Sequence, residues 1–272
     1  MKNITDSEFE RIRVYVKENF GISLSSEKKS LIYSRLHNVI RERDFESFTE
    51  YFDYLMRDRT GEAVSEFIDK VTTNHTYFMR EADHFDYFRE TVLPYIVQKY
   101  KGTKELRLWC AGCSSGEESY TLQMIINDYF RLKSETWSTN QMATDISSQI
   151  LSKAKEGVYE EQKLNVLPKH WLKEYFVKDS PGNLRVSDTI KSQINYQKYN
   201  LMDPKVPFYR LMQIIFCRNV MIYFDPATRE RLVSKFYNST EPGGYLFIGH
   251  SESLNHINTQ YKYIKPAVYR KE

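Results

Sequence analysis

The segment from Leu106 to Tyr120 constrains the fold of this chain more than any other. Apolar residues run up to Trp109, small residues and the glycines Gly112 and Gly116 follow, and a helical apolar pattern begins at Tyr120. A strand, a tight glycine turn and a helix in this order open a ligand site on an α/β sheet. Glycine at such a turn lets the backbone approach a ligand closely, because it carries no Cβ.

The same turn lacks the features of a phosphate site. It matches neither G-x-G-x-x-G nor G-x-x-x-x-G-K-[ST], and two acids, Glu117 and Glu118, stand where a phosphate binder has none. Carboxylates beside a ligand favour hydroxyl groups and cations. S-adenosylmethionine fits this chemistry, since it carries a ribose, a sulfonium and an ammonium but no phosphate. One acid would bind the ligand and the other would cap the following helix, and the sequence leaves both assignments open.

Composition and charge exclude several classes of protein. The 272 residues allow one large domain or two modest ones. Lys and Arg total 39 against 36 acids, so the balance does not indicate a nucleic-acid-binding protein. The N-terminus has no apolar core of a signal peptide, and no run approaches membrane-spanning length. We therefore expect a cytoplasmic protein without direct membrane insertion.

Cysteine and histidine spacing gives little support for a metal or redox site. Cys110 and Cys113 match C-x-x-C, but the only other cysteine is Cys217, far from any second pair. Small buried residues are the favoured interpretation of all three. His75 and the other five histidines show no metal-binding spacing, so no metal ligand is assigned.

The chain divides into a helical N-terminal part and an α/β remainder. Thr5 and Glu8 match a capping box before the first helix, and Ser26 is the expected cap of a second. Two more apolar patterns at helical spacing follow, without any strand pattern. We predict an all-α domain over residues 1–72 and an α/β domain over residues 73–272.

Strand and helix patterns alternate in the second domain, as in βαβ units with a parallel sheet. The pattern breaks near residues 160–200, where a turn at Ser180-Pro-Gly-Asn183 predicts an inserted hairpin subdomain formed by 174–177 and 184–186. We expect the strands of the sheet at 106–109, 140–145, 212–217, 245–248 and 267–269. The strand at 267–269 would close the sheet.

Polar side chains follow the expected strands, where ligands bind in open parallel sheets. Asp145 ends the second strand, and an acid there either accepts both hydroxyls of a ribose or caps the next helix. The glycine turn upstream favours the ribose role. Arg218 and Asn219 follow the third strand, where a charged group needs a ligand or an internal salt bridge. Residues 73–80 mix polar and aromatic residues without period, as in a loop over a site or an ordinary linker.

Five separated motifs in register resemble one family, the chemotaxis-receptor glutamate O-methyltransferases of the CheR type. They are Asn74-x-Thr76-x-x-x-Arg80, Ser115-Gly-Glu-Glu118, Ala143-Thr-Asp-Ile146, Tyr199-Asn-Leu201 and Cys217-Arg-Asn-Val-Met-Ile-Tyr-Phe224. The resemblance covers essentially the whole chain. It implies a class I S-adenosylmethionine-dependent methyltransferase (Rossmann-like) domain with a small β-subdomain, preceded by an all-α domain.

The resemblance also implies roles for individual residues. Arg80 and Tyr223 would face the transferred methyl group and the substrate carboxylate. Serine replaces two residues common in the family, at Ser115 and Ser119, and neither change removes a contacting group. The implied contacts to S-adenosylmethionine are Asn74, Thr76, Arg80, Glu117, Asp145, Asn200, Leu201, Arg218 and Asn219.

The implied activity is methylation of glutamate side chains on the cytoplasmic helices of methyl-accepting chemotaxis receptors, with S-adenosylhomocysteine as product. A basic cluster on the second predicted helix would steer these acidic helices, and a solvated basic face is the alternative. Some members hold a receptor-tail peptide with a glycine-rich loop, but the hairpin turn here has Gly182 alone. The cluster comprises Lys28, Lys29, Arg35, Arg41 and Arg43.

Three other functions share parts of this pattern. A nucleic-acid N-methyltransferase would carry an Asn/Asp-Pro-Pro-aromatic motif after the central strand, whereas this chain has Arg218-Asn-Val-Met221. A non-catalytic sensor of S-adenosylmethionine would not need Arg80 and Tyr223. A methyltransferase for a different protein acceptor remains a third alternative. We expect a monomer that acts on receptors and does not bind nucleic acid.

Overall fold

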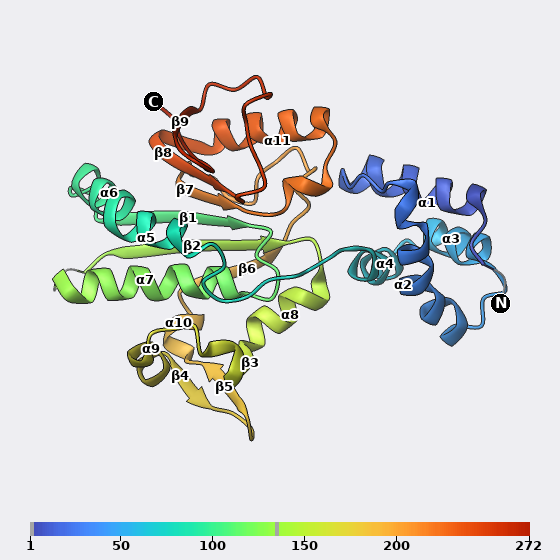
Figure 1. Cartoon of the computed structure of the whole chain (residues 1–272), viewed down its shortest axis with the longest axis horizontal. Helices are drawn as coiled ribbons and strands as arrows, with labels where there is room; N and C mark the ends of the chain where they lie inside the picture. The colour runs from blue at the N-terminus through green and yellow to red at the C-terminus, as the bar shows by residue number, and fades with distance from the viewer. Residues whose placement is uncertain (1–2, 134–135) are drawn as a thin grey trace.

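A seven-stranded sheet forms the centre of the molecule (Figure 1). The computed structural model describes residues 3–133 and 136–272. The strand order is β6-β2-β1-β7-β8-β10-β9, and the first five strands of this order run parallel. Strands β10 and β9 are added antiparallel. The strands are β1 (Glu105–Ala111), β2 (Ser138–Asp145), β6 (Ile194–Lys198), β7 (Met212–Cys217), β8 (Thr240–Ile248), β9 (Lys262–Lys265) and β10 (Val268–Arg270).

Helices cover both faces of the sheet, so its central strands are apolar on both sides. On β1, Leu108 and Cys110 pack into one core cluster, and Trp109 and Ala111 pack into another. None of the helices in residues 3–133 and 136–272 is both long and apolar enough to span a membrane. The helices around the sheet are α5 (Ala82–Tyr87), the π-helix η2 (Phe88–Val92), α6 (Leu93–Lys99), α7 (Glu117–Lys133), α8 (Ser148–Glu156) and α11 (Pro226–Ser239), with a 3₁₀ turn η4 (Met221–Tyr223).

Four helices form a separate layer at the N-terminal end, with their own core of aliphatic and aromatic side chains (Figure 1). The capping box of Thr5 and Glu8 is present, as predicted. Ser26 does not cap the second helix, because it lies within a 3₁₀ turn that precedes that helix. These elements are α1 (Asp6–Phe20), η1 (Ser26–Lys28), α2 (Lys29–Glu42), α3 (Phe48–Arg57) and α4 (Glu62–Val71).

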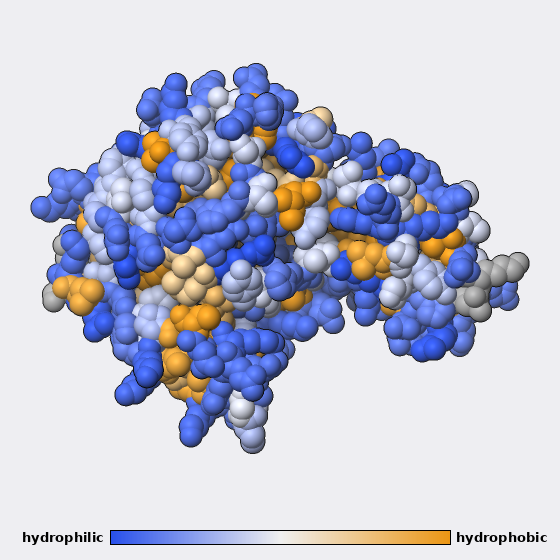
Figure 2. Space-filling view, viewed as in Figure 1, coloured by the Kyte–Doolittle hydropathy of each residue, from blue (hydrophilic) through white to orange (hydrophobic). Residues whose placement is uncertain are grey.

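A small three-stranded sheet of order β3-β5-β4 extends away from the main sheet (Figure 1). The predicted hairpin is present as its β4 and β5, and β3 is an additional strand. Apolar surface gathers over this subdomain (Figure 2), where Val158, Val166 and Val177 are exposed. Its elements are β3 (Val158–Glu160), η3 (Glu161–Leu164), α9 (Lys169–Glu174), β4 (Phe176–Lys178), β5 (Asn183–Val186) and α10 (Asp188–Lys191).

The structure confirms the α/β class and corrects the sequence prediction at the sheet edges. Strands β6 and β9 were not predicted. The last predicted strand, at 267–269, corresponds to β10, which does not close the sheet because β9 lies outside it. Both missed strands lie at an edge. Buried and exposed positions alternate over most of β6, and β9 begins and ends with lysine, so no continuous apolar run marks either strand.

Candidate functional site

A cavity lies at the carboxyl ends of β1, β2 and β7, where ligands bind in open parallel sheets. The loop between α4 and α5 lines one side of it, so residues 73–80 are a loop over a site and not a remote linker. Residues of η1 and α2, including Lys28 and Arg35, close another side. All the residues that the sequence assigned to S-adenosylmethionine line this cavity except Glu117, and Tyr223 lines it too.

The turn after β1 needs its glycines chiefly for protein packing. Gly112 has φ +88°, and a Cβ there would lie 2.5 Å from Cγ2 of Val220. Gly116 has φ +100°, and its Cβ would meet three tyrosine side chains at 3.0 Å. Gly112 lines the cavity but Gly116 does not. Packing of the chain against itself is thus a reason for glycine at both positions, and at Gly112, which lines the cavity, close approach to a ligand stays a prediction.

Replacing Gly112 by alanine should lower the free energy of unfolding by roughly 2–4 kcal/mol, since backbone strain adds to overlap with Val220. The double variant Gly112→Ala with Val220→Ala should recover part of this loss, because the overlapping methyl group is gone. Gly182→Ala is the matched control: its φ is +78° and a Cβ there meets nothing within 4 Å. Urea unfolding of the four proteins measures these differences, and equal losses for Gly112→Ala and Gly182→Ala would contradict the packing argument.

Asp145 ends β2 and is buried at the base of the cavity. Its Oδ2 accepts a hydrogen bond from the Ser114 backbone N–H at 2.8 Å, and its Oδ1 accepts one from the Ser147 N–H at 3.0 Å. Ser147, and not Asp145, caps α8 by accepting a hydrogen bond from the Ile150 N–H. Burial raises the pKa of Asp145 despite these backbone hydrogen bonds. The capping alternative is thus excluded, and the carboxylate lines the cavity.

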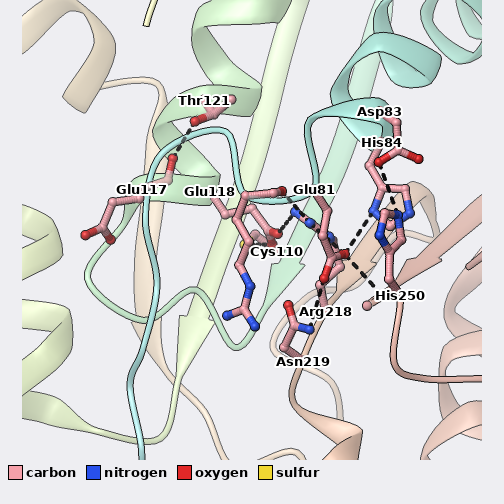
Figure 3. A network of polar contacts seen from close by, with 12 residues as sticks. Glu81, Asp83, His84, Cys110, Glu117, Glu118, Thr121, Arg218, Asn219 and His250 are labelled. Carbon is pink, nitrogen blue, oxygen red and sulfur yellow. Dashed lines mark hydrogen bonds and ion pairs between the residues drawn. The ribbon is translucent and has the colours of Figure 1, made fainter. Parts of the chain in front are cut away.

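Arg218 lies between two carboxylates at the wall of the cavity (Figure 3). Its Nη1 lies 2.7 Å from Oε2 of Glu118, and its Nη2 lies 2.9 Å from Oε2 of Glu81. The guanidinium also donates to the backbone carbonyl of Arg80. Burial lowers the pKa of Arg218, but the charges of Glu118 and Glu81 outweigh it, so the net shift is upward. Arg218 therefore makes an internal ion-pair network and also faces the cavity.

The two acids of the glycine turn have different places. Glu118 lines the cavity and pairs with Arg218. Glu117 is the first residue of α7, is buried, and accepts a hydrogen bond from the Ser115 hydroxyl at 2.7 Å. Figure 3 shows its carboxylate on the side of the turn away from Arg218. Burial raises the pKa of Glu117. The geometry places Glu118, and not Glu117, beside the ligand space.

Asn200 and Tyr223 tie the N-terminal helices to the cavity. The Asn200 amide donates to the carbonyl of Asn19 at 2.8 Å, and the Tyr223 carbonyl accepts from the Ser23 N–H at 2.7 Å. Nζ of Lys28 lies 5.4 Å from the centre of the Tyr223 ring, within range of a cation–π interaction. The all-α layer is thus part of the site.

Comparison with known proteins identifies the family. Residues 7–72 match the model of the CheR methyltransferase all-alpha domain, and residues 74–270 match that of the CheR methyltransferase SAM binding domain. This chain belongs to the CheR methyltransferase family. Its cofactor is accordingly S-adenosylmethionine, and it is an enzyme of the methyltransferase class.

Curated relatives of this CheR-family chain match it over nearly its full length. It is 42% identical to a chemotaxis protein methyltransferase of Borreliella burgdorferi, over 99% of this chain and 95% of that protein. Identity to chemotaxis protein methyltransferase 2 of Vibrio cholerae is 35%, over 94% of this chain and 88% of that protein. Identity to the chemotaxis protein methyltransferase of Escherichia coli is 30%, over 98% of this chain and 91% of that protein. Methylation in chemotaxis is the function these names share.

Three members of the predicted basic cluster of this CheR protein make contacts within the chain. Lys29 pairs with Asp6 at 2.6 Å, and Arg43 pairs with Glu66 at 2.6 Å. Arg35 points inward and donates to the carbonyls of Val71 and Thr72 and to the Thr73 hydroxyl, so it positions the loop that leads to Asn74. Lys28 lines the cavity. Arg41 is exposed, and no ion pair involving it is found among residues 3–133 and 136–272.

The sequence did not identify two acids that organise this site. Glu81 joins the network of Arg218 and also accepts from the Asn219 amide and the His250 N–H. Glu252 is buried and accepts from the backbone N–H groups of Asn219, Ile222 and Gly249. Burial raises the pKa of Glu252 against these hydrogen bonds. Neither residue lies in one of the motifs found in the sequence. Both are far along the chain from their partners Arg218 and Asn219, so no local pattern indicated their roles.

The three cysteines of the chain are buried and free. Burial is the largest cause that raises the pKa of each thiol well above its usual value. The Cys110 thiol donates to Oε1 of Glu118 at 3.1 Å, which places it beneath the ion-pair network. These properties agree with the sequence interpretation of small buried residues, since a thiol that stays protonated is a poor nucleophile and metal ligand.

Proposed function

We propose that this enzyme transfers the methyl group of S-adenosylmethionine to glutamate side chains on the cytoplasmic helices of chemotaxis receptors. The products are glutamate 5-O-methyl esters and S-adenosylhomocysteine. The observation that carries the proposal is that Arg80 and Tyr223 line the same cavity as Asp145 and Arg218. The proposal also assigns a cytoplasmic, monomeric enzyme in which residues 1–72 help dock the receptor and residues 73–272 perform the transfer.

The donor set of the cavity fits the cofactor. The Asp145 carboxylate can accept hydrogen bonds from ribose hydroxyls, since it keeps acceptor capacity beyond the Ser114 and Ser147 N–H groups. Glu118 adds a negative charge that favours the cationic end of the cofactor. When bound, S-adenosylmethionine supplies the methyl group on its sulfonium. We assign to cofactor binding Asn74, Thr76, Arg80, Asp145, Asn200, Leu201, Arg218 and Asn219, with Glu118 in place of Glu117.

Arg80 and Tyr223 have hydrogen-bonding groups left for a substrate carboxylate. The Arg80 guanidinium donates to the His75 carbonyl at 2.8 Å and lies 5.8 Å from the centre of the Tyr77 ring, which leaves further N–H donors. In the described part of the chain the Tyr223 hydroxyl makes no hydrogen bond. Both groups can therefore orient an incoming carboxylate without first losing an internal contact.

The reaction requires orientation more than proton transfer. A glutamate carboxylate is already ionised at neutral pH, so its oxygen attacks the methyl carbon without a general base. Holding the two reactants in line contributes up to roughly 7–11 kcal/mol to lowering the barrier. The enzyme gains most if Arg80 holds the carboxylate without tightening the ground state, because only interactions that strengthen in the transition state accelerate the step.

The test uses S-adenosylmethionine labelled in its methyl group and membranes that contain chemotaxis receptors. Alkali converts a carboxyl methyl ester to volatile methanol, whereas methylated amines and thioethers retain the label. Label released as methanol is the expected result. Cofactor binding without such label would instead support a sensor or a different acceptor, and label that resists alkali would exclude a carboxyl ester.

Tyr223→Phe should lower the rate of receptor methylation about 10–100-fold, because one hydrogen bond to a charged group is lost. The affinity for S-adenosylhomocysteine should stay within twofold, since the phenol ring that lines the cavity is kept. Tyr209→Phe is the control, because Tyr209 is fully exposed and does not line the cavity. An unchanged methylation rate in Tyr223→Phe would remove this residue from the transfer step.

A further inference from the structure

Three side chains with metal-ligating atoms meet beside Arg218 (Figure 3), and none of the three lines the cofactor cavity. Glu81 and His84 stand one helical turn apart at the start of α5, and His250 follows β8. One ligand atom from each lies within 4.8 Å of the others. The spacing between His84 and His250 along the chain explains why histidine patterns in the sequence gave no sign of this group.

His84 is the unusual member, because it is fully buried and neither ring nitrogen makes a hydrogen bond. An imidazole in such a place loses the hydrogen bonds that it has in water, which is unfavourable unless another partner replaces them. An imidazole whose ring nitrogens make no hydrogen bond can use one of them to coordinate a metal ion.

The distance between Glu81 and His84 fits two ligands of one metal ion better than a hydrogen bond. Oε2 of Glu81 lies 3.5 Å from Nδ1 of His84. Ligands about 2.0–2.1 Å from a tetrahedral zinc ion are separated from each other by roughly 3.3–3.5 Å. The ligand atom of His250 lies within 4.8 Å of the other two, and its side chain is 44% exposed.

We propose that Glu81, His84 and His250 bind a divalent first-row cation, with Zn²⁺ as the best match, and leave its fourth position to water. Two histidines and one glutamate are a ligand set that zinc uses in proteins. The negative charges at the site are Glu81 and Asp83, whose Oδ1 lies 3.1 Å from Nε2 of His250. The positive charges nearby are Arg218 on Glu81 and Lys265 on Asp83.

The site would join the loop that lines the cavity to the loop that follows β8. Glu81 ends the loop that carries Arg80, and His250 begins the loop that carries Glu252. A bound ion would link these loops directly, in addition to the hydrogen bond that the His250 N–H donates to Glu81. Because Glu81 also pairs with Arg218, the ion would act as a clamp behind the cofactor cavity, outside the path of methyl transfer.

The test is a titration of the full chain with Zn²⁺ against a fluorescent chelator. Wild-type protein should bind one equivalent, and His250→Ala should bind at least 100-fold more weakly. His256→Ala is the matched control, since His256 is exposed, lies in the same loop and is not one of the three ligands. Zn²⁺ should also raise the Tm of wild type and of His256→Ala but not that of His250→Ala.

Co²⁺ distinguishes this site from the buried cysteines, because only thiolate ligands give an intense charge-transfer band in the near ultraviolet. We expect the protein with Co²⁺ bound to show the visible absorption of tetrahedral Co²⁺ and to lack the thiolate charge-transfer band. Wild-type binding weaker than about 100 µM, equal binding by His250→Ala, or a thiolate band would each overturn the proposal. None of these measurements depends on methyl transfer, so the outcome is independent of the enzyme's substrate.

Discussion

Asp145→Ala should weaken the binding of S-adenosylhomocysteine at least 100-fold. The carboxylate would accept two charge-assisted hydrogen bonds from the ribose, each worth about 1.5–3 kcal/mol. Losing both corresponds to a factor of roughly 100 or more in the dissociation constant. The substitution also removes the acceptor of the Ser114 N–H, which loosens the turn after β1. Isothermal titration calorimetry on the wild type and the variant measures the difference.

Ser147→Ala is the matched control for Asp145. Ser147 lies two positions after Asp145, is buried, and caps α8. Loss of its hydroxyl should therefore lower the free energy of unfolding by about 1 kcal/mol. It does not line the cavity, and cofactor affinity should stay within twofold. Asp145→Asn keeps one acceptor oxygen and should fall between the wild type and the alanine variant. Normal affinity in Asp145→Ala, with the fold intact by thermal unfolding, would exclude the ribose role.

The pH dependence of binding gives a second measurement on the same residue. Burial raises the pKa of Asp145 above the usual value of 3.8 in the protein without ligand. Hydroxyl groups of the ribose need the ionised carboxylate as acceptor, so affinity should fall as the pH is lowered through that raised pKa. The fall should begin at a higher pH than an unperturbed aspartate would give, and it should be absent in Asp145→Asn.

Local patterns in the sequence were sufficient for the elements that carry the cavity. The apolar runs of β1 and β7 are buried at almost every position, which is why period and composition identified them. Asp145 was singled out because an acid ends the second predicted strand, and the glycine turn upstream led us to predict a ribose role for it. The family resemblance then placed Arg80 and Tyr223, which have no local signal of their own.

Long-range contacts explain what the sequence could not predict. Glu81 and Arg218 are separated by 137 positions, and no periodicity relates them. The choice between Glu117 and Glu118 depends on which side of α7 faces Arg218, and adjacent residues at a helix start give no pattern for this. Arg35 illustrates the same limit, since its guanidinium is directed to the carbonyls of Val71 and Thr72 rather than to solvent.

Arg218→Met should lower the free energy of unfolding by about 3–5 kcal/mol, because it leaves the largely buried carboxylates of Glu118 and Glu81 without their partner. Methionine keeps most of the length of the side chain, so the effect of a cavity is small. Arg107→Met is the matched control: Arg107 is equally buried on β1 and pairs with Glu105 and Glu241, remote from the cavity. Urea unfolding of both variants at pH 7 should give losses of similar size.

Cofactor affinity separates the two arginines. At pH 7 in buffer without urea, the folded Arg107→Met protein should bind S-adenosylhomocysteine like the wild type. Arg218→Met should bind it at least tenfold more weakly. Glu118→Gln, which keeps the shape of the side chain and removes its charge, provides the same comparison if Arg218→Met does not fold. Equal affinities in all three variants would mean that the network serves stability alone.

The loss in Arg218→Met should depend on pH in a defined direction. Burial raises the pKa of Glu81, but the hydrogen bond and charge of Arg218 outweigh it and hold that pKa below the usual 4.5. The stability that this pair contributes is therefore present above pH 4.5 and is lost as the pH falls through the lowered value. In the variant the largely buried Glu81 lacks its cation and protonates more readily. The difference in unfolding free energy between wild type and Arg218→Met should thus narrow from pH 7 towards pH 4, and a difference that stays constant would show that charge is not its cause.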